Sequence, residues 1–463
     1  MKAVPAGVRA GFQFQTSFAT LKTKTQQTLD RLRAHESRNV TFMEMDGSWP
    51  IVWARAKGVT VWDIEGRQYL DLTAAFGVAA AGHTNPRIVR AGQRQMATLL
   101  HAMGDVHPHA LKAELAQQLS ALTFARWSRG GTGKTIFCNS GFEAVEAALK
   151  TALLATDKSG IIAFEGAYHG LGYGALNATH REHFRRPFRT QLRKFGQCLP
   201  FPVADETGQQ KSNDAPTLRR LEAAAKDLFR RRHIGAILVE PIQARGGIRV
   251  PPPGFLPLLR RLCDDHGALL VLDEIYTGFG RTGTWFACEQ ADVVPDLICL
   301  GKALTGGFPL SACVGRAAVM DRAWPVSTGE AIHTSTFLGH PVGCAMALAN
   351  IKELHRLRLV PRTARLGKWL RDALAKLSRV PGRLRGRGCG VGLMAGIELF
   401  RPDGSPAGSE SLAIIKRMLH RGFILLPEGE HGNVIGLTPP LTITQAQLRR
   451  TLRALAEEIA ACP

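Results

Sequence analysis

The 463-residue sequence lacks any long uncharged apolar run, and its mean hydropathy is close to zero at −0.04. A membrane-spanning helix needs about 20 consecutive apolar residues, so we expect a soluble protein with no membrane partner. Internal repeats and low-complexity tracts are also lacking. The hydrophobic share of 45% and the charged share of 21% are ordinary for globular proteins, and the chain is long enough for more than one domain.

The nine cysteines form no CxxC pair and show no metal-ligand spacing, so the sequence predicts no metal site. Several of them, such as Cys299 and Cys313, lie inside apolar runs, as reduced buried thiols do. The first 29 residues carry lysine and arginine but no acid, and no apolar stretch typical of a secretory signal. We therefore expect a basic N-terminal arm and a cytoplasmic location.

Acidic residues are scarce, because 38 Asp and Glu stand against 59 Lys and Arg, a formal net charge of +21. The densest basic stretches, Arg181–Lys194 and Arg219–Arg232, match no nucleic-acid-binding motif and do not interleave aromatic residues as stacking platforms do. We expect solvated helix faces and loops, and no nucleic-acid partner. The alternative is a basic rim that attracts an anionic substrate or a phosphorylated cofactor.

Between about residues 105 and 320, short apolar runs alternate with amphipathic helices, which predicts a parallel α/β sheet. Upstream, the alternation in Gly58–Leu72 around Glu65-Gly66 predicts a β-hairpin. From about residue 345 the chain is helix-rich and then punctuated by Gly and Pro, which indicates a smaller α/β domain. The predicted strands of the sheet are Thr135–Cys138, Ile161–Phe164, Ala236–Val239, Leu269–Leu272 and Ile298–Leu300.

A polar cluster follows each of these strands, at the edge where open α/β sheets place their ligands. The clusters are Asn139-Ser140-Gly141, Glu165–His169, Glu240–Gln243, Asp273-Glu274 and Gly301-Lys302. The last two are the most informative. A lysine can form a Schiff base with the aldehyde of pyridoxal phosphate, and a carboxylate can keep the pyridine nitrogen protonated. The alternative for Asp273 is a salt bridge to an arginine such as Arg281.

Three more residues fit the same cofactor. Gly141 opens a helix whose free N–H groups can bind a phosphate, although Ser140 could be an ordinary N-cap. Tyr168 can stack on a flat ring, although a lone tyrosine more often packs in the core. Ile275, two residues after Asp273, could cover the opposite face of the ring.

Taken in order, these segments resemble the class III aminotransferases, a family of fold type I enzymes that use pyridoxal 5′-phosphate. The resemblance runs from about Pro50 to Thr444. It is carried by VWDIEGRQYLDL, GVAAAGHTNP, NSGFEAVEAALK, GAYHG, VEPIQ, LDEIYTGFGRTG, LGKALTGGFPLSA, TFLGHPVGCAMALA and NVIGLTPPLTIT.

The resemblance implies an α/β fold, with a large domain built on a mostly parallel sheet and a smaller α/β domain built from both chain ends. We expect the basic N-terminal arm at residues 1–40 and a segment joining the small domain at 41–75. The large cofactor-binding domain would then span 76–340, and the C-terminal small domain 341–463.

By the same resemblance, Lys302 is the Schiff-base lysine and Asp273 is the partner of the pyridine nitrogen. The backbone N–H groups of Gly141 and Phe142 would bind the phosphate, beside Ser140. Thr336 would reach the phosphate of the neighbouring subunit, which implies a homodimer with shared active sites.

The cofactor ring would lie among the remaining residues of the strand-end clusters. Tyr168 would stack on the ring, with His169 beside it and Ile275 on the other face. Gln243 would lie near the ring hydroxyl, and Glu240 belongs to the same cluster.

The sequence departs from its relatives at two positions near the substrate. Many relatives carry a Glu two residues after the Gln of EPxQ, and this Glu pairs with an Arg just before the LxPPL segment. Here these positions hold Arg245 and Gly436. One hypothesis is that Arg245 binds a substrate carboxylate bidentately. The alternative is that Arg245 points to solvent and the site has lost its carboxylate clamp.

Three aromatic residues complete the predicted substrate pocket. Tyr276 stands where relatives often carry Gln or Met, and Phe142 replaces a small residue at the phosphate loop. Phe76 would line the access channel. These residues predict an aromatic, rather apolar pocket.

We expect transamination from an amine or ω-amino acid donor to a keto-acid acceptor. The alternatives are aminomutase, racemase or decarboxylase chemistry on the same scaffold, which Lys302 and Asp273 alone do not distinguish.

Overall fold

The computed structural model describes residues 22–44, 48–204, 214–379 and 382–462. The chain forms two compact units, one of residues 1–54 and 62–67 and the other of residues 55–61 and 68–463. The boundary between them falls inside β1 (Trp53–Lys57) and β2 (Thr60–Asp63). The domain boundaries predicted near residues 40, 75 and 340 stay predictions.

The first unit contains α1 (Lys24–His35), whose start is fixed by a capping box. Thr23 Oγ1 accepts from Gln26 N–H at 3.2 Å, and Gln26 Oε1 accepts from Thr23 N–H at 3.0 Å. Thr25 N–H donates to Glu65 Oε1 at 2.7 Å, which joins the helix to the turn after β2. Residues 1–21 of the predicted arm lie outside the described residues.

The second unit is built on a seven-stranded sheet. Its strands are β4 (Gly133–Cys138), β5 (Gly160–Phe164), β6 (Gly196–Leu199), β7 (Ile234–Val239), β8 (Leu269–Asp273), β9 (Leu297–Leu300) and β10 (Ser311–Arg316). The order across the sheet is β4-β10-β9-β8-β7-β5-β6, and β10 is antiparallel to both of its neighbours. The other pairs are parallel.

All five predicted strands of this sheet are confirmed, but the sequence did not reveal β6 and β10. Both strands consist mostly of small or polar residues (GQCL and SACVGR) and contain few of the β-branched and aromatic residues that favour strands. β10 is nevertheless buried, because it runs between two neighbours in the sheet.

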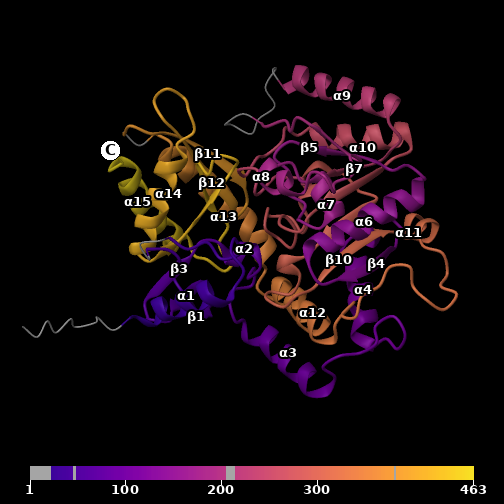
Figure 1. Ribbon diagram of the computed structural model, residues 1–463, viewed down its shortest axis with the longest axis horizontal. Coiled ribbons are helices and arrows are strands. Elements are labelled where there is room, and N and C mark those ends of the chain that lie inside the picture. The colour runs from indigo at the N-terminus through magenta and orange to yellow at the C-terminus, as the bar shows by residue number, and fades with distance from the viewer. Residues whose placement is uncertain (1–21, 45–47, 205–213, 380–381, 463) are drawn as a thin grey trace, which may run out of the picture. The chain divides into compact units, whose positions relative to one another are not determined.

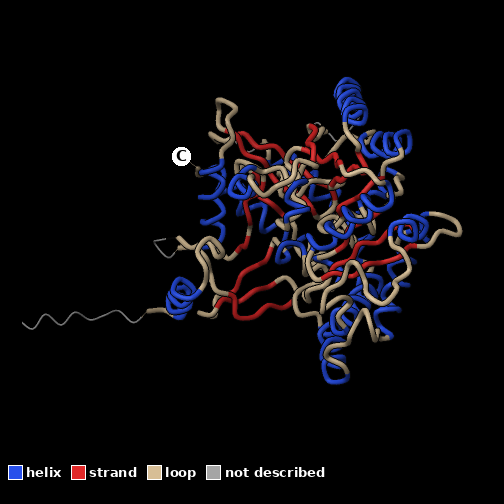
Figure 2. Tube along the Cα trace, turned by 45° about the vertical axis from the view of Figure 1, so that its right-hand side comes forward, coloured by secondary structure: helices blue, strands red, loops and turns tan. Residues whose placement is uncertain are grey.

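Helices cover the sheet because its strands are apolar on both faces. On one face, Val145 and Ala148 of α6 (Gly141–Thr156) share a core with Leu238 and Val271 of β7 and β8. Leu270, the neighbour of Val271 in β8, is equally buried on the other face. There α10 (Phe255–His266) packs against β7 and β8. Figure 2 shows these strands in red among the blue helices.

Further helices connect these elements, and α9 lies beside α10 (Figure 1). They are α2 (Ala74–Gly77), α3 (Pro86–Thr98), α4 (Ala110–Leu122), α5 (Phe124–Trp127), α7 (Tyr173–Ala178), α8 (Glu182–Arg185), α9 (Asp214–Arg231), α11 (Ala317–Ala323), α12 (Pro341–Arg356) and the 3₁₀ helices η1 (Arg186–Phe188), η2 (Ala287–Ala291) and η3 (Lys302–Leu304). In the described ranges, no helix is both long and apolar enough to cross a membrane.

A second sheet lies in the C-terminal part, with the order β11-β12-β15-β14. It comprises β11 (Arg385–Val391), β12 (Met394–Phe400), β14 (Leu426–Glu428) and β15 (Val434–Leu437), and is accompanied by α13 (Leu359–Leu377), α14 (Gly408–His420) and α15 (Gln445–Ala460).

Strands from both parts of the chain meet in a further sheet. β13 (Phe423–Ile424) runs parallel to β3 (Gln68–Asp71), and Phe423 lies opposite Leu70. This pairing confirms that the smaller α/β part draws on both chain ends. The predicted hairpin is confirmed as well, since Asp71 N–H donates to Val59 O at 2.9 Å.

Candidate active site

The five polar clusters follow strands that are parallel to one another, so they meet at one edge of the sheet. β8 and β9 are direct neighbours, and Asp273 lies opposite Cys299. Lys302 comes three residues later on the same edge. The sheet therefore brings together the carboxylate and the lysine that the sequence analysis predicted to act together.

Asp273 is held by His169, which comes from the cluster after β5. His169 Nδ1 lies 2.8 Å from Asp273 Oδ2, and both side chains are buried. The backbone of His169 donates to Thr179 Oγ1 at 2.9 Å, which fixes the position of the ring. Arg281, the alternative partner of Asp273, instead donates to the carbonyls of Leu393 and Pro439.

Lys302 begins η3 in the left-handed region of backbone space, with a φ of 41°. Such a conformation costs a non-glycine residue about 1 kcal/mol or more and is common at functional sites. Its Nζ lies 4.8 Å from the centroid of the Tyr276 ring. Burial lowers the pKa of Lys302, against the opposing effect of Asp273, Glu240 and Glu428. A lysine of lowered pKa supplies neutral amine more readily.

The start of α6 offers free N–H groups. Glu143 accepts from the N–H groups of Asn139 at 2.7 Å and Ser140 at 3.2 Å. Among the described residues, no hydrogen-bond acceptor is assigned to the N–H groups of Gly141 and Phe142. The first turn of the helix can therefore bind an anion.

Ile275 and Gly170 enclose this helix start. A Cβ on Gly141 would lie 3.0 Å from Ile275 Cδ1, and one on Gly301 would lie 3.3 Å from Ile275 Cγ2. A Cβ on Gly170 would come within 2.3 Å of Phe142 Cβ. Glycine is thus required where the cluster after β5 approaches α6.

The cluster after β7 binds the one after β5. Glu240 accepts from the N–H groups of Tyr168 at 3.0 Å and Ala244 at 3.2 Å. Burial raises the pKa of Glu240 to about 7, and His169 counteracts this shift. Gln243 is fully buried and donates from Nε2 to Glu165 O at 2.8 Å.

Gln243 keeps one polar atom without a partner. Its Oε1 is buried, and no hydrogen bond reaches it from the described residues. An unpaired buried acceptor is costly, so this atom fits the role of a ligand contact. Tyr168 is half-buried, and its ring contacts that of Phe184 at 5.5 Å between centroids.

Arg245 has a partner that the sequence analysis did not identify. Its Nη1 lies 3.2 Å from Oε2 of Glu428, at the end of β14. The Arg245 side chain is 32% exposed and that of Glu428 is 8% exposed. Burial raises the pKa of Glu428 to about 7, while Arg245, Arg181 and Lys302 counteract the shift. No local sequence signal marks Glu428, because its meeting with Arg245 depends on long-range folding.

Tyr276 and Phe76 lie on adjoining segments. Tyr276 Oη is 3.1 Å from Thr438 Oγ1, and burial raises its pKa to about 12. A Cβ on Gly77 would lie 3.2 Å from the Tyr276 ring. Phe76 itself is exposed and has a φ of 62°. Its role in an access channel stays a prediction.

Thr336 is exposed on the segment between α11 and α12. Its contact with a neighbouring subunit stays a prediction.

Together these groups fit pyridoxal 5′-phosphate. Gly141 and Phe142 offer N–H groups to a phosphate, and Gln243 Oε1 can accept from a ring hydroxyl. Asp273, held by His169, can pair with a protonated ring nitrogen, and Lys302 can bind the aldehyde.

Comparison with known proteins agrees with this chemistry. The family model for aminotransferase class-III matches residues 42–459. The chain is 35% identical to an acetylornithine aminotransferase of Methanosarcina acetivorans, over 90% of this chain and 93% of that protein. It is 36% identical to the 5-aminovalerate aminotransferase DavT of Pseudomonas aeruginosa, over 88% and 93% respectively.

A solved structure of the ornithine aminotransferase of Toxoplasma gondii superposes with a TM-score of 0.78 and 27% identity, over 96% of each chain. That structure is described with partial occupancy of PLP at its active site. The predicted fold class is thereby confirmed.

Proposed function

Because this chain belongs to the class III aminotransferases, which are enzymes that depend on pyridoxal 5′-phosphate, we propose that Lys302 and Asp273 are its catalytic residues. The observation that carries this proposal is their placement. Asp273 is bound to His169 at the end of β8, and Lys302, with its lowered pKa, follows the neighbouring strand β9.

When bound, the cofactor supplies an aldehyde for the amine and a ring that takes up electrons. Lys302 would hold the cofactor through that aldehyde. Its Nζ, once released, would be the base that takes the proton from the substrate carbon and the acid that gives it up again. Asp273 would pair with the ring nitrogen and so favour the protonated ring.

Other residues hold the cofactor in place. Gly141 and Phe142 would donate backbone N–H groups to the phosphate, and Ser140 lies beside them. Tyr168 and Ile275 would cover the two faces of the ring. His169, Glu240 and Gln243 hold the surrounding segments, and Gln243 would also accept from the ring hydroxyl.

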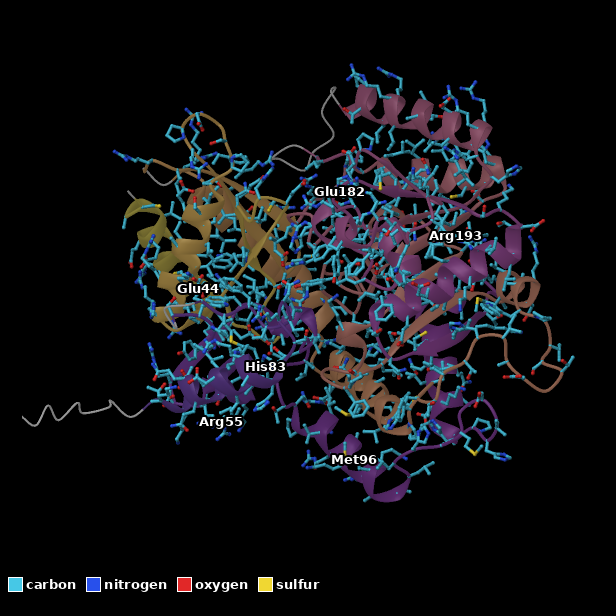
Figure 3. The ribbon with its side chains drawn as sticks, viewed as in Figure 1. Glu44, Arg55, His83, Met96, Glu182 and Arg193 are labelled. Carbon is cyan, nitrogen blue, oxygen red and sulfur yellow. The ribbon has the colours of Figure 1, made fainter. Side chains whose placement is uncertain are left out.

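The phosphate site is completed by Thr336 of a second subunit in a homodimer. An exposed apolar patch supports this part of the proposal: Leu100, Met103, Val106 and Phe337 are each more than half exposed. The two segments adjoin, since the ring centroids of His101 and Phe337 are 5.1 Å apart. Met96 on α3 is also exposed (Figure 3). Exposed apolar surface of this kind marks interaction sites, and this one adjoins Thr336.

The amine donor carries its amino group far from any carboxylate. Acetylornithine and 5-aminovalerate, the substrates in the names of the two relatives, both have such a group. Tyr276 and Phe76 line the donor pocket. Arg245 binds the carboxylate of the keto-acid acceptor, which an arginine recognises through two parallel hydrogen bonds.

The enzyme acts in the cytoplasm. This part of the proposal rests on the nine cysteines, all of which carry free thiols.

The test is an amine-donor screen followed at the cofactor absorbance. A transaminase converts the cofactor to its amine form and releases one equivalent of keto or aldehyde product in the absence of acceptor. Pyruvate and 2-oxoglutarate are then compared for their ability to restore the aldehyde form. Release of carbon dioxide, or product without accumulation of the amine form of the cofactor, would favour decarboxylase, racemase or aminomutase chemistry instead.

A further inference from the structure

The Arg245–Glu428 ion pair joins two segments at the active site. Besides the side-chain contact of 3.2 Å, Gly429 N–H donates to Arg245 O at 3.2 Å. Arg181 donates to the same carbonyl at 3.0 Å. These hydrogen bonds hold the backbone on both sides of the ion pair in place.

Glycine at position 436 makes room for the Glu428 side chain. β14 and β15 are antiparallel, with Leu426 opposite Gly436 and Glu428 opposite Val434. Glu428 and Gly436 thus point to the same face of the sheet. A Cβ on Gly436 would lie 3.2 Å from Glu428 Cγ, so a long side chain there would displace the carboxylate.

The carboxylate lies within electrostatic reach of the reactive lysine. Burial lowers the pKa of Lys302, and Glu428 is among the carboxylates that oppose this effect. Lys302 in turn is among the cations that counteract the raised pKa of Glu428. Tyr276, whose ring lies 4.8 Å from Lys302 Nζ, is also within the electrostatic reach of both Glu428 and Arg245.

The two members of the pair differ in their freedom. Glu428 is 8% exposed and held in a sheet, whereas Arg245 is 32% exposed on a long, flexible side chain. Within the described residues, the hydrogen bond from Arg245 goes to Oε2 of Glu428, and none is assigned to Oε1. A carboxylate has room for more than one donor. Glu428 is therefore the fixed member of the pair, and Arg245 is a counter-ion that another cation can replace.

On this geometry, and resting on the proposed transamination of amines, we propose that Glu428 is a specificity-determining residue that binds the distal ammonium group of a diamine donor. The reacting amine of the diamine faces Lys302, and its second ammonium binds Glu428 as Arg245 turns towards solvent. When the diamine leaves, Arg245 returns and is available for the carboxylate of the acceptor. One ion pair thus serves substrates of opposite charge in the two half-reactions.

The test uses two donors with the same five-carbon chain, pentane-1,5-diamine and pentylamine, in which a hydrogen atom replaces the second amino group. Single-turnover reactions at pH 8.5, followed at the cofactor absorbance, give the apparent Kd and the rate constant separately. We expect the wild type to bind the diamine with a Kd lower by about tenfold or more, since a hydrogen bond to a charged group contributes at least about 1.5 kcal/mol to binding. Glu428→Gln should lose that preference through Kd, while pentylamine changes by less than about threefold.

Two variants sharpen the result. Glu428→Asp retains the charge on a shorter side chain, so it should regain a preference for hexane-1,6-diamine over pentane-1,5-diamine. Glu430→Gln is the matched control, because Glu430 is exposed two residues further on and its loss changes the net charge equally. This control should keep the wild-type preference.

Equal losses for both amines in Glu428→Gln would show a merely structural role and overturn the proposal. The absence of a diamine preference in the wild type would also overturn it. If ω-amino acids convert the cofactor to its amine form and neither pentane-1,5-diamine nor pentylamine does, the enzyme is a transaminase but the proposed role of Glu428 is wrong. If no amine of any kind converts the cofactor, the proposed function fails as well.

Discussion

His169 Nδ1 lies 2.8 Å from Asp273 Oδ2, and the two side chains meet in the interior from the ends of two strands, β5 and β8, that are not neighbours. An ionised carboxylate only accepts hydrogen bonds, so Nδ1 of His169 carries the hydrogen. His169 thus holds the Asp273 carboxylate in place for its proposed pairing with a protonated ring nitrogen.

Replacing His169 by Phe should weaken cofactor binding. The variant keeps a ring of similar shape but removes the donor to Asp273, a hydrogen bond to a charged group that is worth about 1.5–3 kcal/mol. We expect the Kd for pyridoxal phosphate to rise by about 10- to 100-fold, measured by equilibrium titration of the apoenzyme. Asp273→Asn should have a similar effect, and the double variant should add little to either. Additive losses, or a fall in thermal stability with an unchanged Kd, would contradict this role.

Cofactor binding should report the lowered pKa of Lys302. Only the neutral amine attacks an aldehyde. Burial lowers the pKa of Lys302 from the ordinary lysine value of 10.5, so the neutral amine forms at a lower pH. The rate at which apoenzyme regains the absorbance of lysine-bound cofactor should rise with pH and level off at an apparent pKa below 10.5. Lys302→Ala should show no such band and lose at least about 1000-fold in activity, whereas Lys226→Ala on α9 should behave as wild type. A band retained in Lys302→Ala would refute the assignment.

Arg245→Ala should impair the acceptor half-reaction. We expect the KM for keto acids to rise by about tenfold or more, because a bidentate contact with the carboxylate is lost. Arg245→Lys should recover only part of this effect, since lysine lacks the planar fork of donors. Values of KM within about twofold of wild type for every keto acid, roughly 0.4 kcal/mol, would be inconsistent with this role.

Glu428 should make the folded protein less stable as pH rises. Its pKa in the folded state is raised from 4.5 to about 7, so the folded state binds a proton more tightly than the unfolded state does. The contribution of Glu428 to the free energy of unfolding is fully present below pH 4.5 and is lost as pH rises through 7. Glu428→Gln should remove up to about 3 kcal/mol of the fall between pH 4.5 and 8. Denaturant unfolding at both pH values measures it; equal pH dependence in variant and wild type would exclude the raised pKa.

A dimer with shared sites should depend on the exposed apolar patch. We expect sedimentation to give twice the chain mass of 50.3 kDa. The double variant Leu100→Asp with Met103→Asp should dissociate, and its affinity for the cofactor should fall because Thr336 of the second subunit is lost. Val326→Asp is a suitable control, since Val326 is also strongly exposed but is not part of the patch. A wild-type monomer that binds the cofactor fully would rule out the shared site.

Five of the seven strands of the large sheet, and the residues at their ends, were predictable from the sequence. Runs such as Leu269–Leu272 are apolar throughout, and a charged residue at the end of a buried strand stands out in any sequence. Asp273 and Lys302 were found for this reason. The family to which the chain belongs was likewise identified from segments such as LGKALTGGFPLSA, and the family match over residues 42–459 confirms it.

The pairing of side chains from distant segments was not predictable. Arg245 and Glu428 are 183 residues apart, and neither lies in a local pattern that names the other. The sequence analysis considered a solvent-facing Arg245 or one that binds a substrate, but not an internal partner. Gly436 was noted as a missing arginine, whereas the sheet register reveals it as the space that Glu428 needs.

The position of β10 has a consequence for how the protein is made. β10 is the last strand of its sheet to leave the ribosome, yet it lies between β4 and β9. Until Arg316 has been synthesised, these two strands cannot be joined, and each presents an open edge of unpaired N–H and C=O groups. Ser311, the first residue of β10, also donates to Ser140 O at 2.5 Å, next to the free N–H groups at the start of α6. The nascent chain therefore completes its sheet and the anion-binding start of α6 in one late step. Before that step, the open strand edges need protection from edge-to-edge aggregation.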